Sequence, residues 1–322
     1  MRIDAHAHVI VPELLREPWG PRVSWVDGAQ VVELGGRSIR SAVRDFVSID
    51  RILAEQDEAG IDHVVLCPWV NLLGYDVSPE EARERGRIQN AGLAALRSDR
   101  VSVLGTVPLQ APELAASELE ALMAQGFAGV EIAASVNGVA LGDDRLEPFW
   151  AAAEASRALV FIHPTTRGST GPGFDDHYLW NLVGNPGETT VAAAHLVLSG
   201  VLERHPDLRV VLAHGGGAVL ALRGRLVHGW ANLAAARTRL SESPIDSLRR
   251  FHYDTVVFDP QVLRDLVAFA GAEHVLLGSD YPFDMADPRP ADTVAAAGLD
   301  AESERAILGA NAARLLGLEV TR

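Results

Sequence analysis

Short apolar runs alternate with longer amphipathic segments along most of this chain, which is the pattern of strands followed by helices. After a first expected strand at 2–9, further strands are expected at 63–68, 101–107, 129–134, 159–163, 208–214, 251–257 and 274–280. Helices are expected at 49–59, 79–96, 112–125, 145–157, 187–202, 218–236 and 260–269, and in a tail to residue 316. Eight strand and helix units at this length predict an α/β protein with a (β/α)8 TIM barrel.

An open, doubly wound sheet is the alternative architecture, but no glycine-rich fingerprint follows the first strand. Residues 19–47 interrupt the alternation with two tryptophans, a Gly35-Gly36 turn and alternating apolar positions. This pattern predicts a small β-hairpin insertion after the first strand. Because no low-complexity segment or linker divides the chain, residues 1–322 are expected to form one barrel domain that carries the insertion.

Composition narrows the setting of the protein. The chain has 322 residues, of which 48% are hydrophobic, so it is long enough to bury a large core. We find no run of about 18 apolar residues and no signal-type N-terminus, which predicts a cytoplasmic protein without a membrane span. The lone Cys67 has no partner for an internal disulfide, in agreement with a reducing compartment.

Charge excludes several functions. The net charge of −15 argues against binding to nucleic acid, whose phosphates require a basic surface, but it permits small anionic substrates. All 28 basic residues are arginine, and no lysine is present. Schiff-base chemistry and a metal pair bridged by carbamylated lysine are therefore excluded, so that a single metal ion is the better expectation.

Histidines and one aspartate collect where the expected strands end. His6 and His8 alternate on the first strand, so both imidazoles project from one face. His163, His214 and Asp280 end the fifth, sixth and eighth strands, whose C-terminal ends surround the active site in barrels of this type. Each residue alone is compatible with a structural role, but five at one mouth predict a functional centre.

The residue types predict a metal centre with an acid/base group. His6, His8, His163 and Asp280 supply three nitrogens and one carboxylate oxygen, a set that suits Zn²⁺, although Mn²⁺ or another divalent ion is also open. His214 is expected to transfer protons to or from water at the metal or the substrate. The alternative for His214 is a further metal ligand. His177 lies in the long segment 167–186, where a lid over the substrate is expected.

Several motifs resemble the amidohydrolase superfamily, specifically its branch of metal-dependent, non-oxidative decarboxylases such as aminocarboxymuconate semialdehyde decarboxylase (ACMSD). They lie at residues 3–8, 105–114, 182–184 with 188–190, 213–218, 224–225 with 228–229, and 278–283. The resemblance implies the barrel, a metal held by His6, His8, His163 and Asp280, and His214 as the catalytic acid/base. The sequence differs from the pattern of this branch at two places. Asn181 stands where the branch has an aromatic residue, and the proline that the branch has after Gly217 is absent.

The resemblance also implies substrate-binding arginines. Arg225 matches an arginine that in the family reaches the neighbouring subunit's site, which implies a homodimer. Arg44 is the candidate for a second arginine, although its alignment requires a gap of one residue. A guanidinium can bind a carboxylate through two hydrogen bonds, so both roles fit a small anionic carboxylate substrate.

The leading hypothesis is a carboxy-lyase that decarboxylates 2-amino-3-carboxymuconate 6-semialdehyde or a related small unsaturated or aromatic acid, with one Zn²⁺ per subunit. The alternative keeps the metal but predicts a hydrolase or hydratase of a small carboxylated lactone, amide or dienoic acid. A non-enzymatic metal-bearing scaffold is the third hypothesis.

Overall fold

The predicted barrel is present in the computed structural model, which describes residues 1–165, 168, 171–237 and 239–319. Eight strands run in the order β1-β5-β6-β7-β10-β11-β12-β13, and every neighbouring pair is parallel. Their bounds are β1 (Ile3–Val9), β5 (His63–Pro68), β6 (Val101–Gly105), β7 (Gly129–Ala133), β10 (Leu159–His163), β11 (Arg209–Leu212), β12 (His252–Asp254) and β13 (Val275–Leu276).

Backbone hydrogen bonds close the sheet between its first and last strands. The Ala5 amide donates to the Leu277 carbonyl at 2.8 Å, and the Asp280 amide donates to the His6 carbonyl at 2.8 Å. The closure brings the segment around Asp280 directly beside β1. β1 and the segment around Asp280, which are far apart in the sequence, therefore lie side by side at the barrel mouth.

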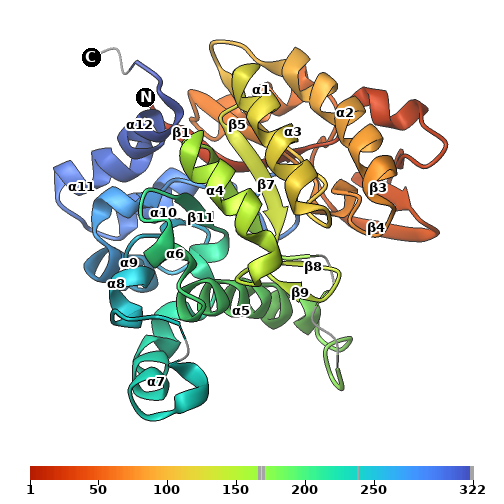
Figure 1. Ribbon diagram of the computed structural model, residues 1–322. Helices are drawn as coiled ribbons and strands as arrows, with labels where there is room; N and C mark the ends of the chain where they lie inside the picture. The colour runs from red at the N-terminus through yellow and green to blue at the C-terminus, as the bar shows by residue number, and fades with distance from the viewer. Residues whose placement is uncertain (166–167, 169–170, 238, 320–322) are drawn as a thin grey trace.

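Helices surround this sheet, as the parallel pairing requires (Figure 1). Their bounds are α1 (Ile49–Glu58), α2 (Pro79–Leu96), α3 (Pro112–Ala124), α4 (Glu147–Ala155), α5 (Asn185–Leu198), α6 (Val201–Arg204), α7 (Val219–Asn232), α8 (Pro244–Leu248), α9 (Pro260–Ala270), α10 (Pro290–Ala296), α11 (Ala301–Arg305) and α12 (Asn311–Leu316). Central strand residues such as Val130, Val160 and Val210 are buried and paired in register, so β-branched side chains fill the layer between strands and helices.

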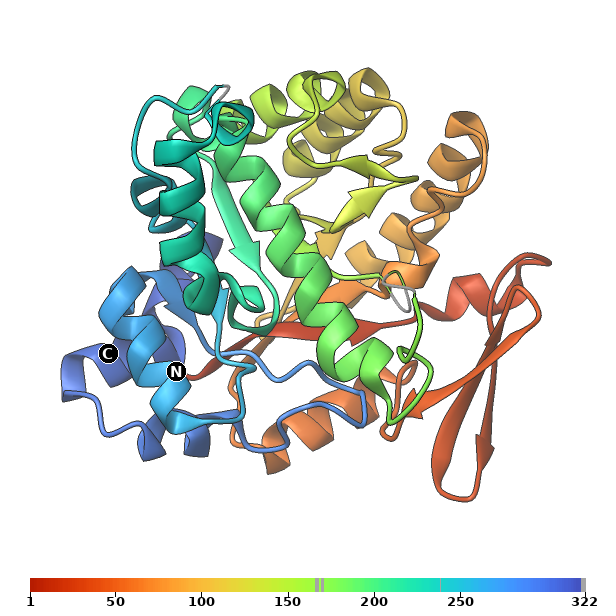
Figure 2. The same cartoon turned by 90° about the horizontal axis from the view of Figure 1, so that it is seen from below.

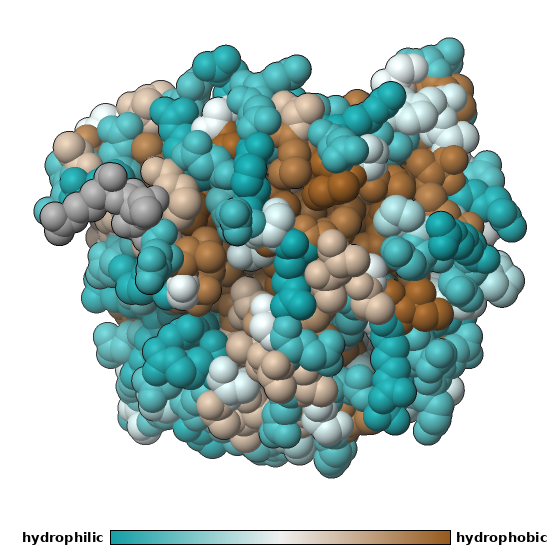
Figure 3. All heavy atoms as spheres, turned by 90° about the horizontal axis from the view of Figure 1, so that it is seen from above, coloured by the Kyte–Doolittle hydropathy of each residue, from teal (hydrophilic) through white to brown (hydrophobic). Residues whose placement is uncertain are grey.

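The insertion after β1 is an antiparallel sheet of three strands, β2 (Arg22–Val26), β3 (Ala29–Leu34) and β4 (Arg37–Ala42). It contains one strand more than the expected hairpin. Seen from below, it projects from the side of the barrel (Figure 2). Seen from above, the surface of the whole molecule shows apolar areas between scattered polar residues (Figure 3). A short two-stranded sheet, β8 (Ser135–Val136) with β9 (Val139–Ala140), follows β7.

Four strands end at least two residues earlier than the apolar pattern predicts, among them β6, which stops at Gly105 although a strand was expected to 107. β11, β12 and β13 stop at Leu212, Asp254 and Leu276, whereas strands were expected to continue to 214, 257 and 280. His214 and Asp280 have positive φ values of 56° and 60°, a conformation that is incompatible with an extended strand. His214 and Asp280 therefore lie on segments that follow the strands, whereas the other three polar residues of the mouth lie within β1 and β10.

Candidate metal centre

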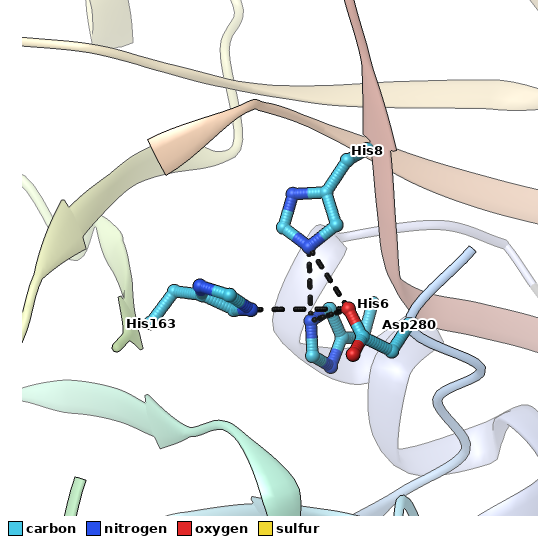
Figure 4. A group of neighbouring side chains, drawn as sticks. All are labelled: His6, His8, His163 and Asp280. Carbon is cyan, nitrogen blue, oxygen red and sulfur yellow. Dashed lines mark hydrogen bonds and ion pairs between the residues drawn. The ribbon is translucent and has the colours of Figure 1, made fainter. Parts of the chain in front are cut away.

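Four side chains converge at the mouth of the barrel (Figure 4). His6 and His8 come from β1, His163 comes from the end of β10, and Asp280 comes from the turn after β13. One ligand atom of each residue lies within 4.8 Å of those of the other three. The closest pairs join His6 Nε2 to His8 Nε2 at 3.1 Å and His6 Nε2 to Asp280 Oδ1 at 3.2 Å.

Acceptors on the far side of each imidazole fix its orientation. The Nδ1 atom of His6 lies 2.6 Å from Asp254 Oδ2, and that of His163 lies 2.8 Å from the Pro164 carbonyl. The Nδ1 atom of His8 lies 3.3 Å from the Pro68 carbonyl. With Nδ1–H donating in each case, the Nε2 lone pairs are directed toward a common point, as a metal requires.

The distances match a small divalent cation. Zn–N bonds of about 2.0–2.1 Å in a tetrahedral site place ligand atoms about 3.3 Å apart. Within the part of the chain that the structure describes, His163 Nε2 and Asp280 Oδ1 are buried and have no hydrogen-bond partner. Such atoms are costly to bury unless a ligand satisfies them. The four side chains therefore form a divalent-metal site.

The charges at the site also suit a cation. Burial lowers the pKa of His163 to about 3, so this imidazole is neutral at physiological pH. Burial would raise the pKa of Asp280, but the charge of His6 and the adjacent imidazoles of His163 and His214 hold it well below its ordinary value. Burial opposes a charge on His6 as well, yet Asp280 and Asp254 raise its pKa to about 10.

His214 lies beside these ligands without joining them. Its Nε2 atom is 3.2 Å from Asp280 Oδ2, whereas Oδ1 of the same carboxylate faces His6, His8 and His163. The group of converging ligand atoms comprises His6, His8, His163 and Asp280. This position fits proton transfer next to the metal better than ligation.

The glycines after His214 are required by close backbone packing. Gly216 has a φ of 76°, and a Cβ atom there would lie 2.7 Å from the Tyr253 ring. Gly217 has a φ of 65°, and its Cβ atom would overlap the Pro186 carbonyl at the start of α5. These two glycines allow the turn that presents His214 to pass between β12 and α5.

Comparison with known proteins identifies the family. A model of the family described as Amidohydrolase matches residues 3–318. The 2-amino-3-carboxymuconate-6-semialdehyde decarboxylase of Dictyostelium discoideum is 30% identical over 336 residues, which cover 99% of this chain and 92% of that protein. The chain belongs to the amidohydrolase family. The predicted family and its decarboxylase branch are thereby confirmed.

Solved structures agree with the fold of this amidohydrolase. The 5-carboxyvanillate decarboxylase of Sphingomonas paucimobilis is 25% identical with a TM-score of 0.84, and the match covers 99% of each chain. A dihydroxybenzoic acid decarboxylase from Polaromonas sp., solved with bound manganese and the inhibitor 2-nitroresorcinol, is 23% identical with a TM-score of 0.82. That match covers 99% of this chain and 98% of the Polaromonas chain.

The two predicted substrate-binding arginines lie in different places. Arg44 is half-buried, and its guanidinium carbon lies 6.0 Å from the ring centroid of Tyr281, which directly follows Asp280. Arg44 therefore lies beside the residue that follows Asp280 in the chain. Arg225 is exposed on α7, a helix that projects from the body of this amidohydrolase (Figure 1). Within one chain the structure does not bring Arg225 to the other predicted site residues.

The segment expected as a lid is tied to the loop after Asp280. The hydroxyl of Tyr178 donates to the Asp284 carboxylate at 3.0 Å, while His177 is exposed. Trp180 is buried and opens the one-turn π-helix Trp180–Gly184, where the sequence departs from the family pattern. Residues 166–167 and 169–170 of this segment lie outside the described residues.

Two fully buried acidic side chains lie next to the metal ligands and were not predicted from the sequence. Asp254 at the end of β12 bonds to His6, and Glu131 on β7 lies 3.5 Å from His8 Nδ1. Burial raises the pKa of Glu131 well above its ordinary value. Glu131 is the one acid within an otherwise apolar strand, which is a signal that something in the interior compensates for its burial. That signal was present in the sequence and could have identified Glu131, whereas Asp254 follows His252 and Tyr253 in β12 and does not stand out in the same way.

Proposed function

We propose that this amidohydrolase is a metal-dependent, non-oxidative decarboxylase of a small unsaturated or aromatic carboxylic acid. The observation that carries the proposal is the convergence of three imidazoles and Asp280, with His214 next to them, in a chain whose relatives are decarboxylases. Substrates named for those relatives, 2-amino-3-carboxymuconate 6-semialdehyde and 5-carboxyvanillate, define the class to test first.

An aromatic wall beside the metal centre supports a flat substrate. The half-buried ring of Phe283 lies 5.4 Å from the His8 ring and 5.4 Å from the Phe46 ring. Phe46 in turn contacts Trp69 at 5.6 Å. Conjugated acids stack favourably on such a surface, since aromatic contacts add to the gain from burial. Arg44 is the candidate to bind a substrate carboxylate near this wall.

Zinc is the metal that we propose, with one ion per subunit. Three imidazole nitrogens and one carboxylate oxygen suit Zn²⁺, whereas the bound manganese of the Polaromonas enzyme makes Mn²⁺ the second candidate. Metal analysis of protein purified without added metal distinguishes the two. When bound, the divalent ion supplies positive charge that binds and polarises a substrate oxygen.

The residues of this chain would then carry out a simple proton exchange. His214, in its protonated form, donates a proton to the substrate carbon that bears the leaving carboxylate. The bond between that carbon and the carboxylate breaks, carbon dioxide leaves, and its bonding electrons restore the conjugated system. His214 regains its proton from water. No oxidant is consumed, because one C–C bond is replaced by one C–H bond.

We also propose a homodimer in which Arg225 reaches the neighbouring subunit's site. Exposed apolar side chains on and near α5 and α7 support an interface there, since large apolar surfaces on these helices are costly in water. They are Leu182, Val183, Val191, Leu222 and Leu233. The proposed interface would place Arg225 against a partner while His214 serves its own subunit.

The experiment is product analysis with purified, metal-loaded protein and the two named acids, together with 2,6-dihydroxybenzoate. We expect one carbon dioxide released for each substrate consumed. A product that keeps every carbon would instead support the hydrolase or hydratase. No helix in the described part of the chain is long and apolar enough to cross a membrane. A cytoplasmic location stays a prediction.

A further inference from the structure

We infer that Asp254 is a positioning residue that holds the metal ligand His6 and the acid/base residue His214 in one hydrogen-bonded unit. The metal-ligand part stands on geometry alone, whereas the role of His214 rests on the proposed function. Asp254 lies at the end of β12 and is fully buried.

The Asp254 carboxylate accepts four hydrogen bonds. Its Oδ2 atom lies 2.6 Å from His6 Nδ1 and 2.9 Å from the amide nitrogen of His214. Its Oδ1 atom accepts from the amides of Gly215 at 2.8 Å and Val256 at 3.1 Å. Both oxygens are thus occupied by donors only, which matches an ionised carboxylate that accepts and never donates.

The bond to His6 has a consequence for the metal. With Nδ1–H donating to Asp254, the Nε2 atom of His6 keeps its lone pair and points toward His8 and Asp280. A carboxylate in this place also makes the imidazole a stronger ligand. Asp254 therefore selects the tautomer that can bind the ion.

The bonds to the backbone have a consequence for His214. The φ of His214 is 56°, a value that is unfavourable for a residue with a side chain. Asp254 accepts from both successive amides of this turn, His214 and Gly215, and so holds the strained conformation in place. The imidazole of His214 is then directed toward Asp280 Oδ2.

A purely structural role, in which Asp254 only satisfies buried amides, predicts a different result after substitution. Asp254→Asn has the same shape but presents an amide NH₂ to donors on one side. It can no longer accept from His6 and from the Gly215 and Val256 amides together. The matched control is Asp287→Asn, since Asp287 is also a buried carboxylate and accepts from the Arg289 amide and the Thr293 hydroxyl.

The first measurement is zinc affinity, by competition with a chromophoric chelator, combined with the visible spectrum of the Co²⁺-loaded protein. We expect Asp254→Asn to bind zinc about 10- to 100-fold more weakly and to shift the Co²⁺ spectrum. Asp287→Asn should retain the affinity and spectrum of the wild type. Folded Asp254→Asn protein with unchanged affinity and spectrum would overturn the inference.

The second measurement uses the wild type, so it does not depend on folding of the variant. In ¹⁵N-histidine spectra of the zinc-loaded protein, the His6 ring should carry a protected proton on Nδ1. His6 can be assigned through its contact with the Phe161 ring, whose centroid is 4.7 Å away. A His6 ring with Nδ1 unprotonated would refute the inference. Both measurements omit substrate, so their outcome is separate from the success or failure of the proposed decarboxylation.

Once an active substrate is known, turnover at saturating zinc tests whether Asp254 also positions His214. Displacement of a catalytic group by about 1 Å costs about 100-fold in rate. We therefore expect kcat of Asp254→Asn to remain at least about tenfold below that of the wild type after its metal site is filled. Full recovery of kcat with added zinc would show that Asp254 positions only His6, and would overturn the coupling to His214.

Discussion

Replacement of His214 by asparagine separates proton transfer from metal binding. His214 Nε2 lies 3.2 Å from Asp280 Oδ2, outside the converging atoms of His6, His8, His163 and Asp280. His214→Asn should therefore retain its full metal content. A positioned acid/base group contributes about 10²- to 10⁴-fold to the rate, equal to about 3–5 kcal/mol in the activation barrier. We expect kcat to fall by that factor.

The assay compares kcat, KM and bound metal per subunit for three variants. KM of His214→Asn should stay within a few-fold of the wild type, because His214 is assigned no contact with a substrate carboxylate. His163→Ala should instead lose metal, since it removes one of the ligand atoms. His195→Asn, on the exposed side of α5, is the matched control and should leave all three quantities unchanged. If His214→Asn loses metal and activity in parallel, His214 is a ligand and the reasoning fails.

Three further results are expected. Metal binding should release about one proton at neutral pH, because Asp280 and Asp254 raise the pKa of His6 to about 10 before a metal binds. The apparent metal affinity should therefore fall about tenfold for each pH unit below that pKa. A metal affinity that does not change with pH would contradict the proton release. Arg44→Met should raise KM about 10- to 100-fold with little change in kcat, whereas an unchanged KM would remove Arg44 from the carboxylate site. Mixing inactive Arg225→Ala and inactive His214→Ala subunits should restore about a quarter of the wild-type activity, since half of the dimers are hybrids with one intact site; no recovery despite confirmed subunit exchange would exclude a shared site.

The barrel could be predicted because its strands are buried on both faces and therefore read as short apolar runs between amphipathic helices. The ligand set could be predicted because the C-terminal ends of parallel strands meet at one mouth, so that His6, His8, His163 and Asp280 had to approach one another. Neither inference required knowledge of side-chain contacts.

The strand ends, the residues behind the metal ligands and the place of Arg225 depend on tertiary contacts, which the order of residues in the chain does not contain. The sequence predicts strands as far as His214 and Asp280, but the positive φ values of both residues exclude an extended strand at these positions. Asp254 was overlooked because it acquires its role from His6, a histidine distant in sequence. Arg225 matched a family motif, yet its expected target lies in another subunit, beyond the reach of a single chain.

Measurement of carbon dioxide release before and after metal removal tests whether the protein is a metal-dependent decarboxylase. The protein is stripped with a chelator and reloaded with stoichiometric Zn²⁺, and each form is supplied with 5-carboxyvanillate labelled only in its 5-carboxyl group or 2-amino-3-carboxymuconate 6-semialdehyde labelled only in its 3-carboxyl group. We expect the reloaded protein to release labelled carbon dioxide in equal amount to the substrate consumed, and the stripped protein to release none. Equal release from both forms, or a product from the reloaded protein that retains the label, would contradict it.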